Sequence, residues 1–254
     1  MVTSGYSSDY SLESLVERYR NFLVPPVSYA TVGDYCDSID HLGALAEANK
    51  DMKDCQRCWM LKAIVGKVAR GARLLEIGAG EPLVADLLCQ LGYDVTIVDP
   101  YDGRANGPAE LEWFRRQYPN LKFFAETFDD KTRLPGRYDC IYSISVLEHI
   151  ALDDLANVFA GIGRHGSTGG VSLHAVDHVL LGAGAEYHLK MLGEVARGCG
   201  IAAEALSRTL ETAINDPETY FLSARAHNMW RGQLSYDEFP MRRCISMQFC
   251  QVAG

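Results

Sequence analysis

Two kinds of segment are missing from the sequence: long apolar runs and an N-terminal export signal. No run of apolar residues approaches the roughly 18 that a membrane-spanning helix needs. The polar stretch from Met1 to Ser14 also lacks the apolar centre of a signal peptide. We therefore expect a cytoplasmic protein with no membrane partner.

Positive charge is also scarce. The 254 residues include 24 Lys and Arg against 33 Asp and Glu, so the formal net charge is −9. Because nucleic-acid binding depends mainly on contacts from Lys and Arg to phosphates, we expect no nucleic-acid partner. Hydrophobic residues make up 48% of the chain, which excludes intrinsic disorder and suits one large domain or two small ones.

Cysteine occurs eight times, but not in a pattern typical of disulfides or zinc sites. Only Cys55 and Cys58 form a C-x-x-C pair, and no second pair follows at zinc-finger spacing. Cys89, Cys140 and Cys250 lie in apolar runs, where a thiol packs like a small hydrophobic side chain. We interpret the cysteines as free thiols.

The pattern along the chain changes at about residue 70. Helix-like patterns before it, separated by Pro25 and Pro26, predict a helical preface or cap over residues 1–70. Over residues 71–254 short apolar runs alternate with helical stretches, which is typical of a parallel sheet covered on both faces. The strands are predicted at 73–77, 94–98, 121–125, 138–143 and 170–174, with two later ones at 219–223 and 245–252 that would form an antiparallel edge.

A glycine turn follows the first predicted strand, in the segment Leu74-Leu-Glu-Ile-Gly-Ala-Gly-Glu81. Gly78 and Gly80 lie between a strand and a helix, where backbone N–H groups can approach a ligand closely. Asp99 ends the next strand and can accept hydrogen bonds from both hydroxyls of a ribose. Taken alone, Glu76 could interact with a helix dipole, and Asp99 could be a turn residue. Both occur together at the spacing of a strand–helix–strand unit, and this combination favours a ligand site.

The same turn argues against a dinucleotide. The G-x-G-x-x-G fingerprint needs glycine or alanine at position 83, and the sequence has Leu83 there. The carboxylate of Glu76 would repel a pyrophosphate and suits a cation. An NAD-dependent oxidoreductase is therefore disfavoured.

Three motifs together resemble a known family. These are E-x-G-x-G at 76–80, the strand-terminal Asp99, and Tyr138-Asp-Cys-Ile-Tyr-Ser-Ile-Ser-Val-Leu-Glu-His-Ile150. They look like the class I S-adenosylmethionine-dependent methyltransferases, over about residues 60 to 175. The resemblance implies a Rossmann-like, doubly wound seven-stranded sheet with an antiparallel last strand. It also implies S-adenosylmethionine as cofactor and S-adenosylhomocysteine as product.

The resemblance also implies which residues contact the cofactor. Glu76 would help order the glycine loop, Asp99 would hold the ribose, and the residues after the third strand would contact the adenine. The family often has an acidic residue there, whereas spacing to Asp139 puts Thr127 at that place, with Glu126 beside it. The implied cofactor contacts are Glu76, Gly78, Ala79, Gly80, Asp99, Pro100, Glu126, Thr127, Phe128, Ser143 and Ser145.

The acceptor should lie above the carboxyl ends of the fourth and fifth strands. The candidate catalytic residues there are His149, His174, Asp177 and His178. His149 is either a base or a residue that caps a helix or packs on the cofactor. For the other three, one interpretation makes His174 or His178 a general base oriented by Asp177. In a second, His174, Asp177, His178 and His188 include ligands for a divalent metal that binds vicinal oxygens. In a third they belong to a solvated loop. Of the two functional interpretations, the metal-free one is favoured.

We therefore predict methyl transfer to a small-molecule acceptor, with an oxygen of a sugar or natural-product intermediate as the preferred target. A catalytically silent, cofactor-binding regulatory protein is the alternative from another class. Residues 220–243 combine aromatic and cationic side chains. They are either a surface hairpin between the last two strands or the source of acceptor specificity, for which this segment is the best candidate. The sequence is compatible with a homo-oligomer.

Overall fold

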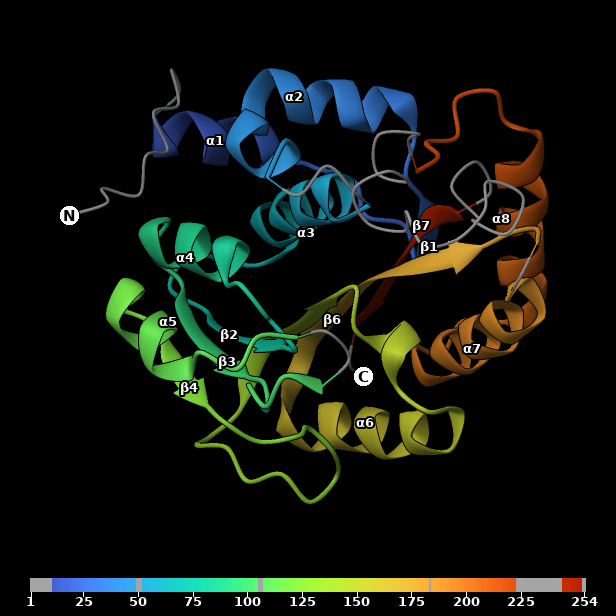
Figure 1. Cartoon of the computed structure of the whole chain (residues 1–254). Coiled ribbons are helices and arrows are strands. Elements are labelled where there is room, and N and C mark those ends of the chain that lie inside the picture. The colour runs from blue at the N-terminus through green and yellow to red at the C-terminus, as the bar shows by residue number, and fades with distance from the viewer. Residues whose placement is uncertain (1–10, 49–51, 105–106, 183, 223–243, 253–254) are drawn as a thin grey trace.

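One mixed sheet runs through the computed structural model, which describes residues 11–48, 52–104, 107–182, 184–222 and 244–252. Its seven strands lie in the order β1–β7–β6–β5–β2–β3–β4, with helices on both faces (Figure 1). The strands are β1 (Val27–Tyr29), β2 (Arg73–Ile77), β3 (Asp94–Val98), β4 (Lys122–Phe124), β5 (Tyr138–Ile144), β6 (Gly166–Val179) and β7 (Cys244–Val252). The predicted Rossmann-like, seven-stranded α/β fold with an antiparallel last strand is confirmed, because β7 runs antiparallel to β6.

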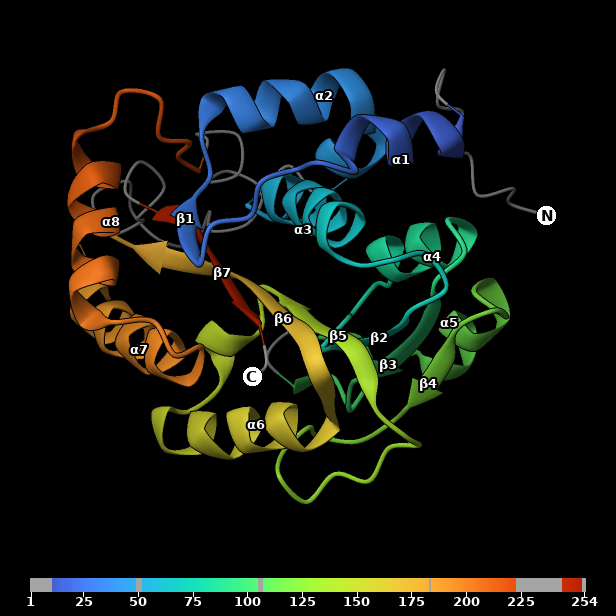
Figure 2. The same cartoon turned by 180° about the vertical axis from the view of Figure 1, so that it is seen from behind.

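The helices form a layer on each face of the sheet (Figures 1 and 2). One layer contains α1 (Leu12–Tyr19), α2 (Val32–Ala46), α3 (Lys53–Lys67), α4 (Leu83–Gln90) and α5 (Leu111–Gln117); the other contains α6 (Leu152–His165), α7 (Ala185–Gly198) and α8 (Ala203–Asn215). Strand side chains alternate between the layers, so Leu74 packs in the first core and Leu75 in the second. In the described part of the chain, no helix combines the length and apolar character needed to span a membrane.

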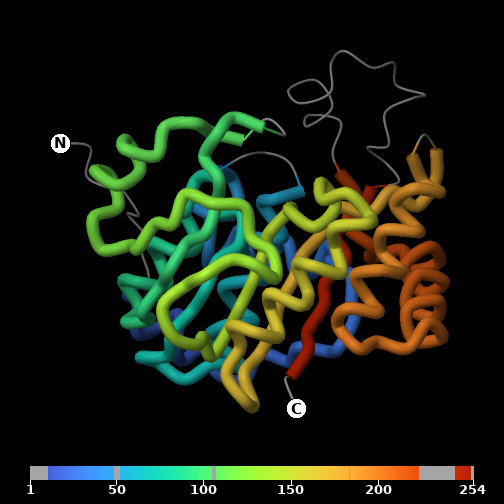
Figure 3. Tube along the Cα trace, turned by 90° about the horizontal axis from the view of Figure 1, so that it is seen from below, coloured from blue at the N-terminus to red at the C-terminus, as the bar shows by residue number. Residues whose placement is uncertain are grey.

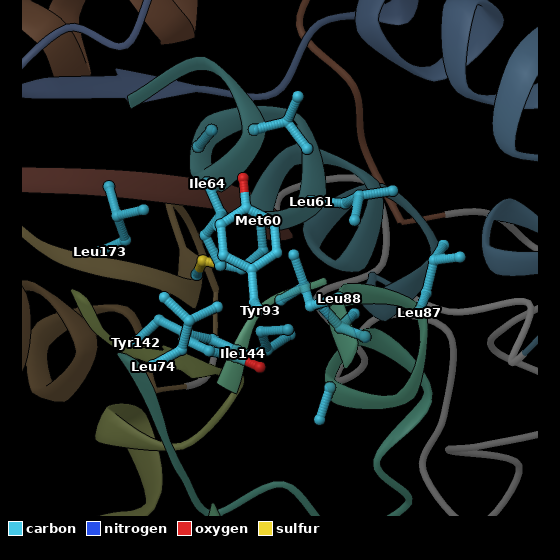
Figure 4. Close-up of a cluster of buried hydrophobic side chains, with 14 of the residues drawn as sticks. Met60, Leu61, Ile64, Leu74, Leu87, Leu88, Tyr93, Tyr142, Ile144 and Leu173 are labelled. Carbon is cyan, nitrogen blue, oxygen red and sulfur yellow. The ribbon is translucent and has the colours of Figure 1, made fainter. Parts of the chain in front are cut away.

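The first helical layer packs on the sheet through a continuous apolar core (Figure 4). Its labelled members are Met60, Leu61 and Ile64 of α3, Leu87 and Leu88 of α4, Tyr93, and Leu74, Tyr142, Ile144 and Leu173 of the sheet. Helix α3 therefore shares one core with strands that lie beyond residue 70. The division into residues 1–70 and 71–254 stays a prediction.

Residues 219–222, the described part of the strand predicted at 219–223, form no strand. Thr219 makes only an isolated bridge to Thr31, and residues 220–222 belong to no strand. The edge next to β7 is instead occupied by β1, with Val27 opposite Phe249. Figure 3 shows this pairing as the red β7 segment lying beside the blue chain of the N-terminal region. The three-residue β1 is too short for its pattern to be recognised, and its partner is more than two hundred residues away.

The carboxyl ends of β2, β3, β5 and β6 meet at one edge of the sheet, because these strands are parallel. The strand order reverses between β2 and β5. From β2 the chain passes through α4 on one face, and from β5 it passes through α6 on the other. Loops that leave in opposite directions open a crevice at this switch point, where ligands bind in open α/β sheets.

A buried lysine links the three N-terminal helices through an ion pair and hydrogen bonds. Lys62 of α3 is 2% exposed, and its ammonium lies 2.6 Å from the Asp37 carboxylate and 2.9 Å from the Ser38 hydroxyl, both on α2. The Tyr19 hydroxyl of α1 donates to the same carboxylate at 3.0 Å. The pKa of Asp37 is lowered by Lys62 and Tyr19, although its partial burial opposes this.

We expect Lys62→Met to lower the free energy of unfolding by about 2–3 kcal/mol, because it leaves Asp37 without its buried cation. The loss should stay below that of a fully buried pair because Asp37 is 38% exposed, so water solvates part of its charge. Urea denaturation followed by circular dichroism measures it. Lys67→Met, at the exposed end of the same helix, is the matched control and should cost less than about 1 kcal/mol. Equal losses in both variants would contradict the role of Lys62.

Candidate functional site

A cavity of about 370 Å³ opens at the switch point. Its walls come from the loops after β2, β3, β4 and β5, and from the first turns of α3. Those loops contain the glycine turn and the acidic residue that the sequence singled out. The cavity therefore gives the predicted ligand site a location and a size.

The glycine turn needs both of its glycines. Gly78 has a φ of +68° and Gly80 a φ of +55°, both in the left-handed region that favours glycine. A Cβ at Gly78 would also lie 2.7 Å from Cγ2 of Val146, closer than side chains pack. The backbone therefore passes directly against the residues that follow β5, which brings its amides to the cavity wall.

Asp99 fixes this turn from the end of β3. One carboxylate oxygen accepts the Gly80 N–H at 3.0 Å, and the other accepts the Tyr101 N–H at 2.8 Å. The Tyr101 hydroxyl donates back to the Gly80 carbonyl at 3.1 Å. Each carboxylate oxygen keeps a further lone pair, so Asp99 can accept a pair of ligand hydroxyls while it holds the loop.

Glu76 lies at the floor of the cavity and is 3% exposed. Burial raises the pKa of its carboxyl to about 8, although the Tyr142 hydroxyl, which donates to it at 3.1 Å, and the Arg57 guanidinium both lower the pKa. At neutral pH the group is therefore largely protonated and ready to ionise beside a cation.

The predicted cofactor contacts fall into two groups. The residues that line the cavity are Glu76, Gly78, Ala79, Gly80, Asp99, Pro100, Thr127, Phe128 and Ser145. Glu126 and Ser143 are not among the residues found there. Ser143 still lies within β5, is 0% exposed, and bonds His174 at 2.8 Å.

Two lining residues from α3 were not predicted. Lys53 and Arg57 lie four positions apart, hence on one face of the helix, and both line the cavity. Arg57 is 5% exposed, so its charge is buried at the wall. The available signal was a pair of basic residues four positions apart, in the segment where only the C-x-x-C pair was considered.

His174 lies inside the sheet rather than at the cavity. It is 0% exposed, and its ring nitrogens lie 2.8 Å from the Ser143 hydroxyl and 2.6 Å from the Ser172 hydroxyl. Burial lowers its pKa to about 3. Both nitrogens are thus occupied within the protein, and we assign His174 a structural role.

Asp177 and His178 point to opposite faces of β6, because strand side chains alternate. Asp177 accepts hydrogen bonds from Gln56 of α3 at 2.9 Å and from Ser145 at 3.3 Å. His178, 2% exposed, packs at 6.3 Å ring separation from His188 of α7. Burial and His188 lower the pKa of His178 to about 4. The structure therefore places Asp177 and His178 on opposite faces of the sheet, and they do not share one site.

A second buried carboxyl lies next to Asp177. Glu148, in the short helix η2 (Leu147–His149), accepts the backbone N–H of Asp177 at 3.0 Å. Its other oxygen is buried and has no hydrogen-bond partner among the described residues. Burial first, and the charge of Asp177 second, raise the pKa of Glu148 to about 8.

His149 is the predicted catalytic residue that lines the cavity. It is exposed and follows β5, on the wall that also contains Ser145 and Ile150. Among the described residues, no group of three His, Cys, Asp or Glu side chains is arranged to hold a metal ion. The eight cysteines all lie in the described part of the chain, and no disulfide joins any two of them there. Residues 223–243 of the predicted specificity segment lie outside the described part of the chain.

A comparison with known protein families identifies the family of this chain. A family model described as a methyltransferase domain matches residues 34–214. The chain belongs to this family, the class I S-adenosylmethionine-dependent methyltransferases. The match covers the sheet from β2 to β6, the glycine turn and α3. The fold and the motifs of the methyltransferase agree with it, and its cofactor is S-adenosylmethionine.

Individual relatives of the methyltransferase are distant. It is 29% identical over 129 residues to a ubiquinone biosynthesis O-methyltransferase of Albidiferax ferrireducens, covering 48% of this chain and 50% of that protein. The chain thus spans about half the length of the curated relative it matches.

Solved structures are similar at low identity. A TehB-like methyltransferase of Corynebacterium glutamicum is 21% identical, with 54% of this chain and 70% of that chain covered and a TM-score of 0.42. A putative sarcosine dimethylglycine methyltransferase of Galdieria sulphuraria is 17% identical, with 77% and 84% covered and a TM-score of 0.46.

Proposed function

We propose that this methyltransferase transfers a methyl group to an oxygen of a small polar acceptor, such as a sugar or natural-product intermediate, with His149 as general base. The observation that carries the proposal is the position of His149. It is exposed on the cavity wall after β5, beside Ser145. The O-methyl activity in the name of the Albidiferax relative agrees with an oxygen acceptor.

The lining residues fit the cofactor part by part. Asp99, with a free lone pair on each oxygen, would accept the two ribose hydroxyls. Pro100, Thr127 and Phe128 would contact the adenine. At the amino-acid end, the buried guanidinium of Arg57 suits a carboxylate and Glu76 suits an ammonium group.

The bound cofactor supplies an activated methyl group on a sulfonium. The protein then has two tasks, which are to align the acceptor oxygen with the methyl and to remove its proton. His149 can take that proton on a ring nitrogen and release it to solvent, because the side chain is exposed.

Cofactor binding should release a proton from Glu76. In the free protein its pKa of about 8 leaves the carboxyl mostly protonated at pH 7. A bound ammonium or sulfonium lowers that pKa, so up to one proton leaves on binding. Calorimetry at pH 7 in buffers of different ionisation enthalpy counts it. Glu76→Gln should abolish the release; equal proton counts in variant and parent would contradict the role.

The acceptor proposal is tested by product analysis. The enzyme is incubated with S-adenosylmethionine and a panel of polyhydroxylated sugars, phenols and matched amines, with and without a chelator. We expect methyl ethers, identified by NMR, and full activity in the chelator. An N-methyl product would refute the oxygen acceptor, and loss of activity that returns with added Mg²⁺ would refute the metal-free mechanism.

The NAD-dependent oxidoreductase considered from the sequence is set aside, since the matching family is a methyltransferase domain. If the chain is instead a catalytically silent regulatory protein, no arm of the same assay should give a methylated product. A cytoplasmic location and a homo-oligomer remain predictions.

A further inference from the structure

Strand β6 runs on past the end of its parallel neighbour β5. The last paired residues are Ile144 of β5 and Ala175 of β6, whereas β6 continues to Val179. One further backbone link follows, because the Ser145 N–H donates to the Ala175 carbonyl at 2.9 Å. The next N–H of β6 on the same edge is that of Asp177, two residues on, and it lies beyond the end of β5.

Glu148 accepts this N–H from outside the sheet. One of its carboxyl oxygens lies 3.0 Å from the Asp177 nitrogen, and the residue is 6% exposed. A buried N–H without an acceptor is unfavourable, so the carboxyl takes the place of a strand carbonyl. Since burial and the charge of Asp177 raise the pKa of Glu148 to about 8, the group is mostly uncharged at pH 7.

The loop that contains Glu148 is also attached to β6 at its start. Ser145 has a φ of +54°, a conformation that is unfavourable for residues other than glycine and needs support from its surroundings. Its hydroxyl lies 3.0 Å from the Gln56 carbonyl oxygen and 3.3 Å from the Asp177 carboxylate. Asp177 therefore contacts the loop twice, through its carboxylate and through its N–H.

His149 follows these attachments directly. It comes after Glu148 in η2, and its N–H donates to the Val146 carbonyl at 2.9 Å. With about three residues per turn, neighbouring side chains of such a helix point in different directions. One turn thus buries the Glu148 carboxyl against β6 and places His149 on the cavity wall.

We propose that Glu148 is a positioning residue for methyl transfer, whose carboxyl fastens the loop after β5 to the Asp177 N–H and so sets the place of His149 at the cavity. The proposal rests on the proposed function, in which His149 is the general base. Glu148 is not among the residues that line the cavity, so it acts through His149. A displacement of about 1 Å at a reacting group can lower a rate about 100-fold.

The kinetic test compares three substitutions in the whole chain. Glu148→Gln keeps an uncharged acceptor oxygen at the same place and should keep kcat within about threefold. Glu148→Ala removes the acceptor, and Glu148→Asp shortens the side chain, so each should lower kcat about 10- to 100-fold. The affinity for S-adenosylhomocysteine should stay within about threefold in all three variants. Single-turnover kinetics with an acceptor from the sugar and phenol panel, together with calorimetry, measure both quantities.

Ser172→Ala is the matched control, because it removes another buried hydrogen bond of β6, to His174 at 2.6 Å, that involves no residue of the loop. It should destabilise the fold but change kcat less than about twofold. The inference is overturned if Glu148→Ala and Glu148→Asp keep kcat within threefold of the parent, or if they lose cofactor affinity as strongly as kcat. It is also overturned if Glu148→Gln loses as much kcat as Glu148→Ala.

Amide hydrogen exchange followed by NMR needs no acceptor. In the complex with S-adenosylhomocysteine, the N–H groups of Asp177 and His149 should exchange at least about tenfold faster in Glu148→Ala, and like the parent in Glu148→Gln and Ser172→Ala. Unchanged exchange in Glu148→Ala overturns the inference. If the exchange rises as expected but no acceptor is methylated, the proposed function fails while the attachment of the loop by Glu148 stands.

Discussion

Replacing Asp99 by alanine is expected to weaken binding of S-adenosylhomocysteine at least 100-fold. The variant removes two charge-assisted hydrogen bonds to the ribose, each worth about 1.5–3 kcal/mol. It also removes the carboxylate that accepts the N–H groups of Gly80 and Tyr101, so the glycine turn loses its anchor. Calorimetric titration of both proteins measures the ratio of dissociation constants.

The matched control is Asp94→Ala, at the other end of the same strand. Asp94 is 40% exposed and pairs with Lys122 at 2.5 Å on the surface, where an ion pair contributes little. It should leave the affinity within about twofold. If Asp99→Ala binds S-adenosylhomocysteine within tenfold of the parent, the ribose site has been placed wrongly.

Replacing His149 by alanine is expected to lower kcat about 100- to 1000-fold, because the acceptor proton loses its general base. The affinity for S-adenosylhomocysteine should change less than about threefold, since binding to the cofactor uses other residues. Single-turnover kinetics with an acceptor from the sugar and phenol panel separates the chemical step from binding.

Added imidazole distinguishes a base from a structural histidine. It should restore part of the activity of His149→Ala in proportion to its unprotonated fraction, and it should leave the parent unaffected. A variant with normal kcat, or one that loses cofactor affinity and gains nothing from imidazole, would remove His149 from the mechanism.

The part of the cavity wall that follows β2 and β3 was predictable because its signals are local. The glycine turn joins one strand to one helix, and Asp99 ends the next strand, so spacing alone brings them together. The βαβ pattern fixes the order of these elements in the sheet. Nine of the eleven predicted contacts accordingly line the cavity.

The acceptor half depends on contacts that sequence spacing does not reveal. His174, Asp177 and His178 are close in the chain, but β6 is longer than predicted and continues through all three, so they alternate between its faces. The partner of Asp177 is Gln56, 121 residues away on α3. Pairing of β1 with β7 is likewise a long-range event, and it replaced the strand expected at 219–223.

The central claim is that the cavity at the β2–β5 switch point binds S-adenosylmethionine. Calorimetric titration of the whole chain with S-adenosylmethionine, S-adenosylhomocysteine and NAD tests it directly. We expect one site for each of the first two compounds, lost in Asp99→Ala, and no binding of NAD. Binding of NAD, or absence of binding by both S-adenosyl compounds, would contradict it.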